Sequence, residues 1–418
     1  MRRSMAVGLA AYGLLLTGLL AVDGRFLVLA LPLWVYLGAA LFAYPAAPRL
    51  AATRSIDRPV VTEGQPVTVT LRLRNDGARD ALVAVTDLIP PELLLCDGVL
   101  DCMALLSPAE TLTLTYTLAT RRGTFRLDGV AVASGEPLDL LHHADRLVLS
   151  TQLVVLPRVD KWRPVKLRPS RTLGFTGPIP SRRGGAGTDV HGVREYHPGD
   201  PLRHINWRAT ARYHDRAFTT EFEQERITDV GIILDLRRQC ALKAGSECLL
   251  DHSVRATAAM SETLLRAGHR VGLLMYGKGQ QWVLPGYGRV QQLRILQALA
   301  AATVAEGTLF DSLRYLSTRL FPARSQLIFV SPLMPDDHEI LFRLRAHGYS
   351  VLVVCPDIVT FQAQAADPPF AALAVRLARV ERASLLRQLR QGGIVVADWP
   401  VDSPLEEKLN AASAAGRP

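Results

Sequence analysis

The sequence predicts an α/β fold with a doubly wound sheet, preceded by an all-β sandwich and a two-helix membrane hairpin. From residue 230 onward, apolar runs of strand length alternate with longer helix-like segments. Between residues 50 and 157, apolar and polar residues alternate with a period of two. The first 45 residues hold two long uncharged runs, which explain a mean hydropathy of +0.14. At about 150 residues per domain, a chain of 418 residues has room for two to three such parts.

The composition narrows the class of protein. Hydrophobic residues make up 49% and charged residues 21% of the chain, which excludes a disordered chain. The net charge of +9 points to anionic partners, such as phospholipid headgroups, nucleic acid or an acidic protein face. The five cysteines include no Cys-x-x-Cys pair. This spacing excludes a disulfide framework and a zinc ribbon, and it fits a reducing compartment.

Residues 1–45 are predicted to form a transmembrane hairpin with spans over residues 5–22 and 26–44. Each run is just long enough, because a helix needs about 20 apolar residues to cross the hydrocarbon core. Only Asp23-Gly24-Arg25 separates the two runs, so the chain must turn back there. A signal peptide that ends near residue 22 is the alternative, and it would shift the topology by one crossing.

The orientation follows from the basic residues beside the spans. These are Arg2 and Arg3 before the first span, and Arg49, Arg54 and Arg58 after the second. The tip between the spans carries only Arg25, offset by Asp23. Because cytoplasmic flanks are rich in Lys and Arg, both ends of the hairpin and everything after it are predicted to be cytoplasmic.

Residues 50–157 are predicted to form an immunoglobulin-like sandwich. Apolar side chains occupy every second position over residues 67–73 and 112–118, with threonine and arginine between them. Asn75-Asp76-Gly77 and Pro90-Pro91 are turn signals that separate such strands. Nothing in this segment resembles a chemical site, so we expect a spacer or an interaction module.

Residues 158–229 form a basic strap followed by a dense polar and aromatic block. Between Arg158 and Arg183 the chain has eight basic residues and one acidic residue. Nucleic-acid binding would require exposed aromatics interleaved with this charge, and Trp162 is thin evidence for such a surface. We therefore expect a solvated strap that pairs locally with acidic groups, and no nucleic-acid partner.

Residues 230–400 are predicted to form the doubly wound domain, followed by a C-terminal tail over residues 401–418. The predicted strands are residues 230–236, 271–276, 326–331, 351–355 and 394–397, and the predicted helices are residues 250–265, 291–305, 338–347 and 371–391. Ligands of such sheets bind at the carboxyl ends of the strands. Asp235 ends the first of these strands and Ser331 ends a later one.

The polar block resembles the hallmark of the bacterial domain of unknown function 58 family. The positions that carry the resemblance are Gly187, Arg194, Tyr196, Gly199, Asp200, Arg203, Trp207 and Arg212. Asp189, Val190 and Asn206 stand where the family usually has Glu, Phe and Asp. Arginines and acidic groups around Tyr196 and Trp207 could form an ion network with aromatic stacking, and one interpretation is that the block clamps the strap against the α/β domain. The other interpretation is a surface for docking a partner or ligand.

The resemblance extends over nearly the whole chain and implies a von Willebrand factor A-like α/β domain. Such a domain usually binds Mg²⁺ through Asp-x-Ser-x-Ser after its first strand. Here the motif reads Asp235-Leu236-Arg237-Arg238-Gln239, and a later strand ends in Ser331-Pro332 where the family tends to show Ser-Asp. Because Mg²⁺ requires small oxygen ligands, we expect a degenerate site without metal or other cofactor. A salt bridge from Asp235 to Arg237 or Arg238 is expected instead.

No constellation in the sequence predicts catalysis. His191, His197 and His204 lack a metal-ligand spacing, and no nucleophile elbow or phosphate loop is present. Asp336 and Asp337 are interpreted as caps of the following helix. A catalytic interpretation would need His191, Asp235 and a hydroxyl group within hydrogen-bond reach of one another. We therefore predict that the protein is not an enzyme.

The family resemblance implies a membrane-anchored, non-enzymatic scaffold for protein interactions. Its implied partners are the lipid of the bacterial inner (plasma) membrane and a MoxR-type AAA+ ATPase in envelope or complex maturation. Both termini and the main domains would then be cytoplasmic. The alternative is a Mg²⁺-dependent von Willebrand A module that binds a ligand or a protein.

Overall fold

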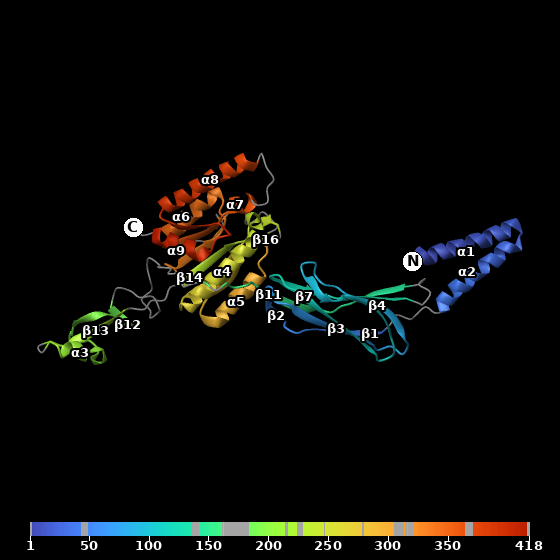
Figure 1. Cartoon of the computed structure of the whole chain (residues 1–418), viewed down its shortest axis with the longest axis horizontal. Helices are drawn as coiled ribbons and strands as arrows, with labels where there is room; N and C mark the ends of the chain where they lie inside the picture. Colours follow the sequence, from blue (N-terminus) through green and yellow to red (C-terminus); the bar gives the residue numbers. More distant parts are fainter. Residues whose placement is uncertain are drawn as a thin grey trace. The chain divides into compact units, whose positions relative to one another are not determined.

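The computed structural model describes residues 2–42, 49–135, 142–160, 162, 184–213, 216–223, 229–245, 247–277, 280–304, 313, 316, 321–363 and 371–415. The chain divides into two compact units, residues 1–156 and 157–418, and each is described by itself. Figure 1 shows the elements of both units in chain order.

Two helices open the chain, α1 (Arg2–Ala21) and α2 (Gly24–Phe42), and they pack against each other. The break between them lies at Val22 and Asp23, one residue earlier than the predicted turn. Asp23 explains the shift, because its Oδ1 accepts a hydrogen bond from the Arg25 backbone N at 3.0 Å and so caps α2. Within the described residues, no helix combines the length and the apolar character that a membrane crossing requires.

The rest of the first unit is made of strands. One antiparallel sheet has the order β1 (Leu50–Ile56), β3 (Val67–Asn75), β7 (Thr111–Ala119), β5 (Leu94–Gly98). A second has the order β10 (His142–Leu147), β9 (Val130–Gly135), β4 (Ala81–Asp87), β6 (Asp101–Leu106). A third joins β2 (Val60–Thr62), β11 (Thr151–Leu156) and β8 (Gly123–Leu127). The alternation seen in the sequence buries Val67, Val69, Leu71 and Leu73 on one face of β3.

A buried ion pair that no pattern in the sequence predicts lies among the strands of the first unit. The Arg54 side chain is fully buried and forms a salt bridge with Asp87. Its Nη1 also donates to the Leu127 carbonyl at 2.6 Å, while the Tyr116 hydroxyl donates to Asp87 Oδ2 at 2.7 Å. Burial, followed by the hydrogen bond to Asp87, raises the pKa of Tyr116. Arg54 therefore cannot face lipid headgroups, which corrects its place in the orientation argument and leaves Arg49 and Arg58 on that side.

The second unit contains a six-stranded sheet. Its order is β18 (Gln280–Gly286), β17 (Arg270–Tyr276), β14 (Asp229–Asp235), β19 (Gln326–Val330), β20 (Ser350–Pro356), β21 (Val395–Trp399). All neighbours are parallel except β18, which runs antiparallel to β17 at the edge. Numbered along the chain, the order is 3-2-1-4-5-6, so its direction reverses between β14 and β19. Apolar runs did not predict β18, because its sequence is partly polar and exposed.

Helices cover both faces of this sheet, as Figure 1 shows for α4 and α5 on one side and α6 and α8 on the other. The helices are α4 (Leu249–Arg266), α5 (Gly288–Ala300), α6 (His338–Ala346), α7 (Ile358–Ala363), α8 (Ala371–Gln391) and α9 (Leu405–Ala415). Within β14, Ile232 joins the cluster on the α4 side and Ile233 the cluster on the α6 side. The expected tail is instead partly helical: Leu405 and Leu409 of α9 are buried in the first of these clusters.

A two-stranded ribbon precedes the sheet in the chain. It pairs β12 (Gly184–Glu195) with β13 (Phe218–Glu223), so that Glu195 lies opposite Phe218. Between the strands lie a short 3-10 turn, η1 (Leu202–His204), and one helical turn, α3 (Trp207–Thr210). Most of the basic strap, residues 163–183, falls outside the described residues.

Candidate interaction and cation sites

Arg194 is the centre of an ion network that closes the ribbon. Its Nη1 and Nη2 donate to the two carboxylate oxygens of Asp200 at 2.8 and 2.7 Å. Its Nε donates to Glu221 Oε1 at 2.8 Å, which ties β12 to β13. Hydrogen bonds from Arg194, together with the His197 backbone N–H, hold the pKa of Asp200 below its ordinary value. The hallmark residues Arg194 and Asp200 therefore fix the path of the chain between the two strands.

The segment between the strands, residues 196–217, is called the hallmark loop below. Gly199 adopts a left-handed φ of 111°, which explains why the turn before Asp200 carries glycine. Asn206 Oδ1 accepts the Ala209 backbone N–H at 3.0 Å and caps α3, so the amide serves where the family has a carboxylate.

The expected ion network is present, but Trp207 does not stack in it. Its side chain is 72% exposed, and the ring contact found in this region is instead between Tyr213 and Phe218, with centroids 5.2 Å apart. Tyr196 is half-buried, and its backbone N–H pairs with Ala217. The hallmark thus divides into residues that shape the loop and residues that project from it.

The remaining hallmark residues are exposed or lie outside the described side chains. Arg203 is exposed and donates to His204 Nε2 at 3.3 Å, and Arg212 is exposed. Gly187 and Asp189 belong to β12, but the Asp189 side chain is outside the described part of the chain.

A second arginine-centred site lies at the carboxyl edge of the six-stranded sheet. Asp235 ends β14, and Ser331 follows β19, so both lie where the strand order reverses. Such a position is where open α/β sheets bind their ligands. The Ser331 hydroxyl donates to Asp235 Oδ2 at 2.6 Å, which brings together two of the predicted site residues.

The Arg237 guanidinium fills this edge. It binds Asp235 through Nε and Nη2, at 2.9 and 2.8 Å, and Asp337 through Nη1 and Nη2, at 3.0 and 2.7 Å. Gln239 adds a further donor to Asp235 Oδ2 at 3.1 Å. The predicted salt bridge to Asp235 therefore uses Arg237, whereas Arg238 is exposed.

Burial removes the charged groups of this cluster from solvent, so their charges must be balanced within the cluster. The side chains of Arg237, Asp235 and Asp337 are only 1%, 2% and 2% exposed. Burial would lower the pKa of the Arg237 guanidinium, but the hydrogen bonds and charges of the two aspartates outweigh burial and raise it. The cation is therefore permanent, and each carboxylate is paired as a buried charge must be.

The residues present do not fit the Mg²⁺ that a von Willebrand A-like site would hold. A Mg²⁺ ion needs free oxygens about 2.0–2.1 Å from the metal in octahedral geometry. Here both aspartates already bind the guanidinium through both of their oxygens, and Ser331 donates its proton to Asp235.

Asp337 is the member of the site that sequence reasoning missed. It was interpreted as a helix cap, and its Oδ2 does accept the Met334 backbone N–H at 2.7 Å in the turn η4 (Pro335–Asp337). Its buried position beside Arg237 is not predicted by the sequence, because Asp337 lies beyond the end of the strand, where the family motif has its carboxylate. The acidic pair Asp336-Asp337, a few residues after Ser331, is the sequence feature that could have indicated this position.

No nucleophile of the usual kind emerges from the described residues. Asp235 and the Ser331 hydroxyl do meet, but both are used in the cluster, and the His191 side chain lies outside the described part. Burial raises the pKa of the Cys240 thiol well above its ordinary value, and that of Cys355 to about 11. Buried thiols of this kind are inert.

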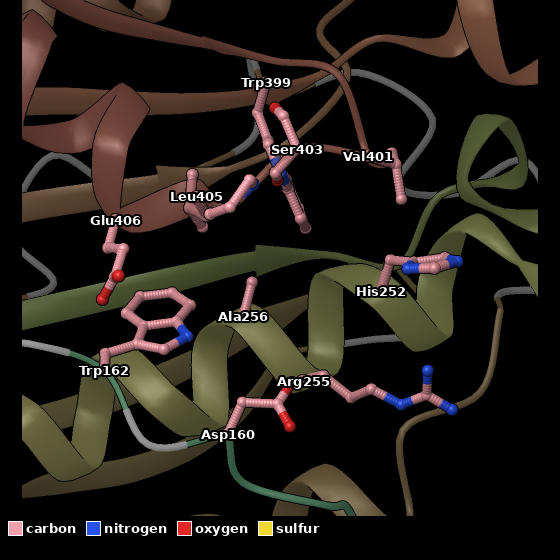
Figure 2. A pocket seen from close by; sticks show the side chains of 11 residues that line it. Asp160, Trp162, His252, Arg255, Ala256, Trp399, Val401, Ser403, Leu405 and Glu406 are labelled. Carbon is pink, nitrogen blue, oxygen red and sulfur yellow. The ribbon is translucent and has the colours of Figure 1, made fainter.

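A cavity of about 350 Å³ lies elsewhere in the second unit. His252, Arg255 and Ala256 of α4 line it, together with Trp162 and residues from 399 to 406 (Figure 2). Trp162, an aromatic residue of the strap, is partly buried and packs against the core of the α/β region.

The part of the chain that matches a known protein family contains both Arg194 and Arg237. Residues 192–360 match the family model described as "Protein of unknown function DUF58". "Uncharacterized protein YeaD" of Bacillus subtilis (strain 168) is 26% identical over 254 residues, which cover 59% of this chain and 61% of that protein. The chain thus spans less than two thirds of the length of this curated relative.

Solved structures match only a part of the chain. The ASH / PapD-like domain of human CEP192 is 17% identical and covers 24% of this chain and 85% of its own, with a TM-score of 0.18. The CARDB domain of the PF1109 protein from Pyrococcus furiosus is 18% identical and covers 27% and 96%, with a TM-score of 0.19. Scores at this level support no argument about this chain.

Proposed function

We propose, from the premise that this chain belongs to the DUF58 family, that it is a membrane-anchored, non-enzymatic scaffold that docks partner proteins. The proposed partner is a MoxR-type AAA+ ATPase acting in envelope or complex maturation. The resemblance of the hallmark to the family is the basis for that partner, and the hallmark loop is the proposed docking element.

The proposed anchor is the pair of helices α1 and α2. Both helices leave large apolar side chains exposed, including Leu9 at 70%, Leu20 at 78% and Val28 at 71%. An exposed apolar surface of this size marks an interaction site, and lipid suits it because each helix contains a long uncharged run. Arg2 and Arg3 at the start of α1, with Arg49 and Arg58 after α2, favour a cytoplasmic position for both termini and for both units.

Thiol labelling tests this topology. Cys240 and Cys355 are buried and cannot report on it, whereas Cys96 of β5 is exposed. A Cys102→Ser/Cys248→Ser variant keeps Cys96 as the one exposed thiol. An impermeant maleimide should fail to label it in intact cells and should label it after permeabilisation. Equal labelling in both cases would place the stranded unit outside and refute the orientation.

One observation carries the docking role: the hallmark loop exposes aromatic and basic side chains that the ion network does not use. Leu202 is 71%, Trp207 72% and Tyr213 63% exposed. Within the described ribbon, the carboxylates of Asp200 and Glu221 pair with Arg194, and that of Glu195 pairs with Arg216. Exposed Trp and Arg are the residues that dominate binding energy at protein interfaces, and the exposed Arg203 and Arg212 favour an acidic partner face.

Copurification from membranes tests the proposed function. The tagged full chain is crosslinked in intact cells and purified in detergent, and AAA+ ATPases are quantified by mass spectrometry. Trp207→Ala should reduce the recovered ATPase at least about tenfold, because losing a central aromatic anchor costs 2 kcal/mol or more. Tyr287→Ala, which removes an aromatic ring that is 54% exposed in the α/β region, is the matched control and should leave recovery unchanged. Failure of the wild type to recover any AAA+ ATPase would contradict the proposed partner.

A further inference from the structure

The proposed docking role leaves the Arg237 cluster without a function. The cluster is buried, lies where the strand order reverses, and joins segments that are far apart in the chain: Arg237 and Asp337 are 100 residues apart, and Ser331 and Asp235 are 96 apart. Structural ion pairs occur in many cores, but this one lies where the strand order of the sheet reverses. Two carboxylates bind a single positive charge at the edge where such sheets bind ligands, and a hydroxyl donates to one of the two carboxylates.

The arrangement of the oxygens is that of a cation site. Nη2 of Arg237 is shared by one oxygen of each carboxylate, Asp235 Oδ2 at 2.8 Å and Asp337 Oδ2 at 2.7 Å. Ser331 Oγ lies 2.6 Å from the same Asp235 oxygen. Hard divalent cations are bound by carboxylate and hydroxyl oxygens at about 2.0–2.6 Å. The oxygens around Nη2 would therefore have to move inward by less than about 1 Å to bind such a cation.

We infer that Arg237 is a resident cation: its guanidinium permanently takes the place of a divalent metal ion at the carboxyl edge of the sheet. It supplies the positive charge that the two aspartates require, and it comes from the same chain, so this edge does not respond to divalent metals. Its charge is not released at physiological pH, because arginine does not deprotonate in proteins. The guanidinium also fastens the loop after β19 to the end of β14.

A consequence follows for variants at this position. Removal of the guanidinium leaves two buried carboxylates and a hydroxyl that face one another, which is a latent divalent-cation site. Arg237→Ser removes the charge and adds a second small hydroxyl two residues after Asp235. The variant should therefore acquire a metal dependence that the wild type does not have.

The experiment measures Mn²⁺ binding and thermal stability of the full chain purified in detergent. Mn²⁺ binding is followed by loss of the free-ion electron paramagnetic resonance signal. The wild type should show the same melting temperature in EDTA and in Mn²⁺. Arg237→Ser should melt lower than the wild type in EDTA and bind Mn²⁺ at least about tenfold more tightly. At ten times its dissociation constant, Mn²⁺ should raise the melting temperature of this variant by about 3 °C or more.

Two further variants make the result decisive. Arg237→Ser/Asp337→Asn removes one carboxylate and should lose the gain in Mn²⁺ affinity, which ties the gain to this site. Arg237→Lys keeps a positive charge, so it should remain insensitive to Mn²⁺ and to EDTA, and it serves if Arg237→Ser does not fold. A Mn²⁺ response of the wild type that Asp337→Asn abolishes would overturn the proposal. So would a Mn²⁺ response of Arg237→Lys, or an Arg237→Ser variant that folds and binds Mn²⁺ no better than the wild type.

Discussion

Two arginines in the second unit have nearly the same partners and very different surroundings. Arg237 and Arg194 each bind two carboxylates, and each makes a two-pronged contact with at least one of them. The Arg237 side chain is 1% exposed, and its two aspartates are 2% exposed. The Arg194 side chain is 39% exposed, and Asp200 and Glu221 are 17% and 34% exposed. The two networks therefore use the same kind of arginine–carboxylate contact and differ in how deeply their side chains are buried.

Because of this difference in burial, the Arg237 cluster holds the edge of the sheet in one arrangement, whereas the Arg194 network directs the path of the hallmark loop. Around Arg237 no water can replace a lost partner, so each group depends on the others and the edge of the sheet is held in one arrangement. Around Arg194 solvent competes for each contact, so the network contributes little to stability. What it contributes is the path of the hallmark loop, from which Trp207 projects.

The largest effect is expected from Arg237→Ala. The variant leaves Asp235 and Asp337 as buried, uncompensated charges, and breaking a buried ion pair in this way costs about 3–5 kcal/mol. Thermal unfolding of the full chain in detergent measures the loss. Arg238→Ala is the control, because that neighbour is exposed and should change stability by no more than about 0.5 kcal/mol. Similar costs for the two variants would remove the distinction between the two networks.

Local patterns in the sequence predicted individual elements well and contacts between distant residues poorly. The predicted helix over residues 371–391 coincides with α8 (Ala371–Gln391), because helical periodicity is a property of neighbouring residues. The pairing of Arg237 with Asp337 spans 100 residues, and that of Arg54 with Asp87 spans 33. No periodicity encodes such a pairing, so Arg54 was assigned to a membrane flank and Asp337 to a helix cap. Asp235, Arg237, Gln239 and Ser331 were found because a family motif, rather than periodicity, singled them out.

His269 extends the comparison, because it is buried, with 6% of its surface exposed, and its Nδ1 has no hydrogen-bond partner among the described residues. Burial lowers the pKa of His269, since the charged imidazolium is the form that loses solvation. The folded state then binds fewer protons than the unfolded state, so stability is full above the unfolded pKa of about 6.5. Stability should fall as the pH drops from about 6.5 towards the folded pKa.

Melting temperatures of the full chain between pH 5 and pH 8 test this expectation. His269→Gln removes the imidazole at this position, so its curve should be flatter than that of the wild type. Parallel curves would mean that His269 has a partner that stabilises its charged form, and burial would then not control its titration.

A smaller effect is expected from Arg194→Ala. The guanidinium is more than a third exposed, so its loss should shift the melting temperature of the full chain by less than about 1 °C. Its effect should appear in the hallmark loop, as faster proteolysis after the arginines there and as weaker copurification of the AAA+ ATPase. A drop in melting temperature comparable to that of Arg237→Ala would show that exposure does not separate the two networks.

The smallest effect concerns Asp200 in acid. Arg194 holds the pKa of Asp200 below its ordinary value, so the folded carboxylate keeps its charge at a pH where the unfolded one is protonated. The stability from this pair is present above the unfolded pKa of about 3.9 and is lost as the pH falls through the lower folded pKa. Hydrogen exchange of the His197 backbone N–H, which donates to Asp200 Oδ2 at 3.0 Å, should report the loss as reduced protection in this acid range.

The effect should shrink in high salt, because exposed charges are screened. In Asp200→Asn the protection should not depend on pH in this range; a persistent dependence would assign it to another carboxylate, with Glu221 the nearest candidate because it also binds Arg194.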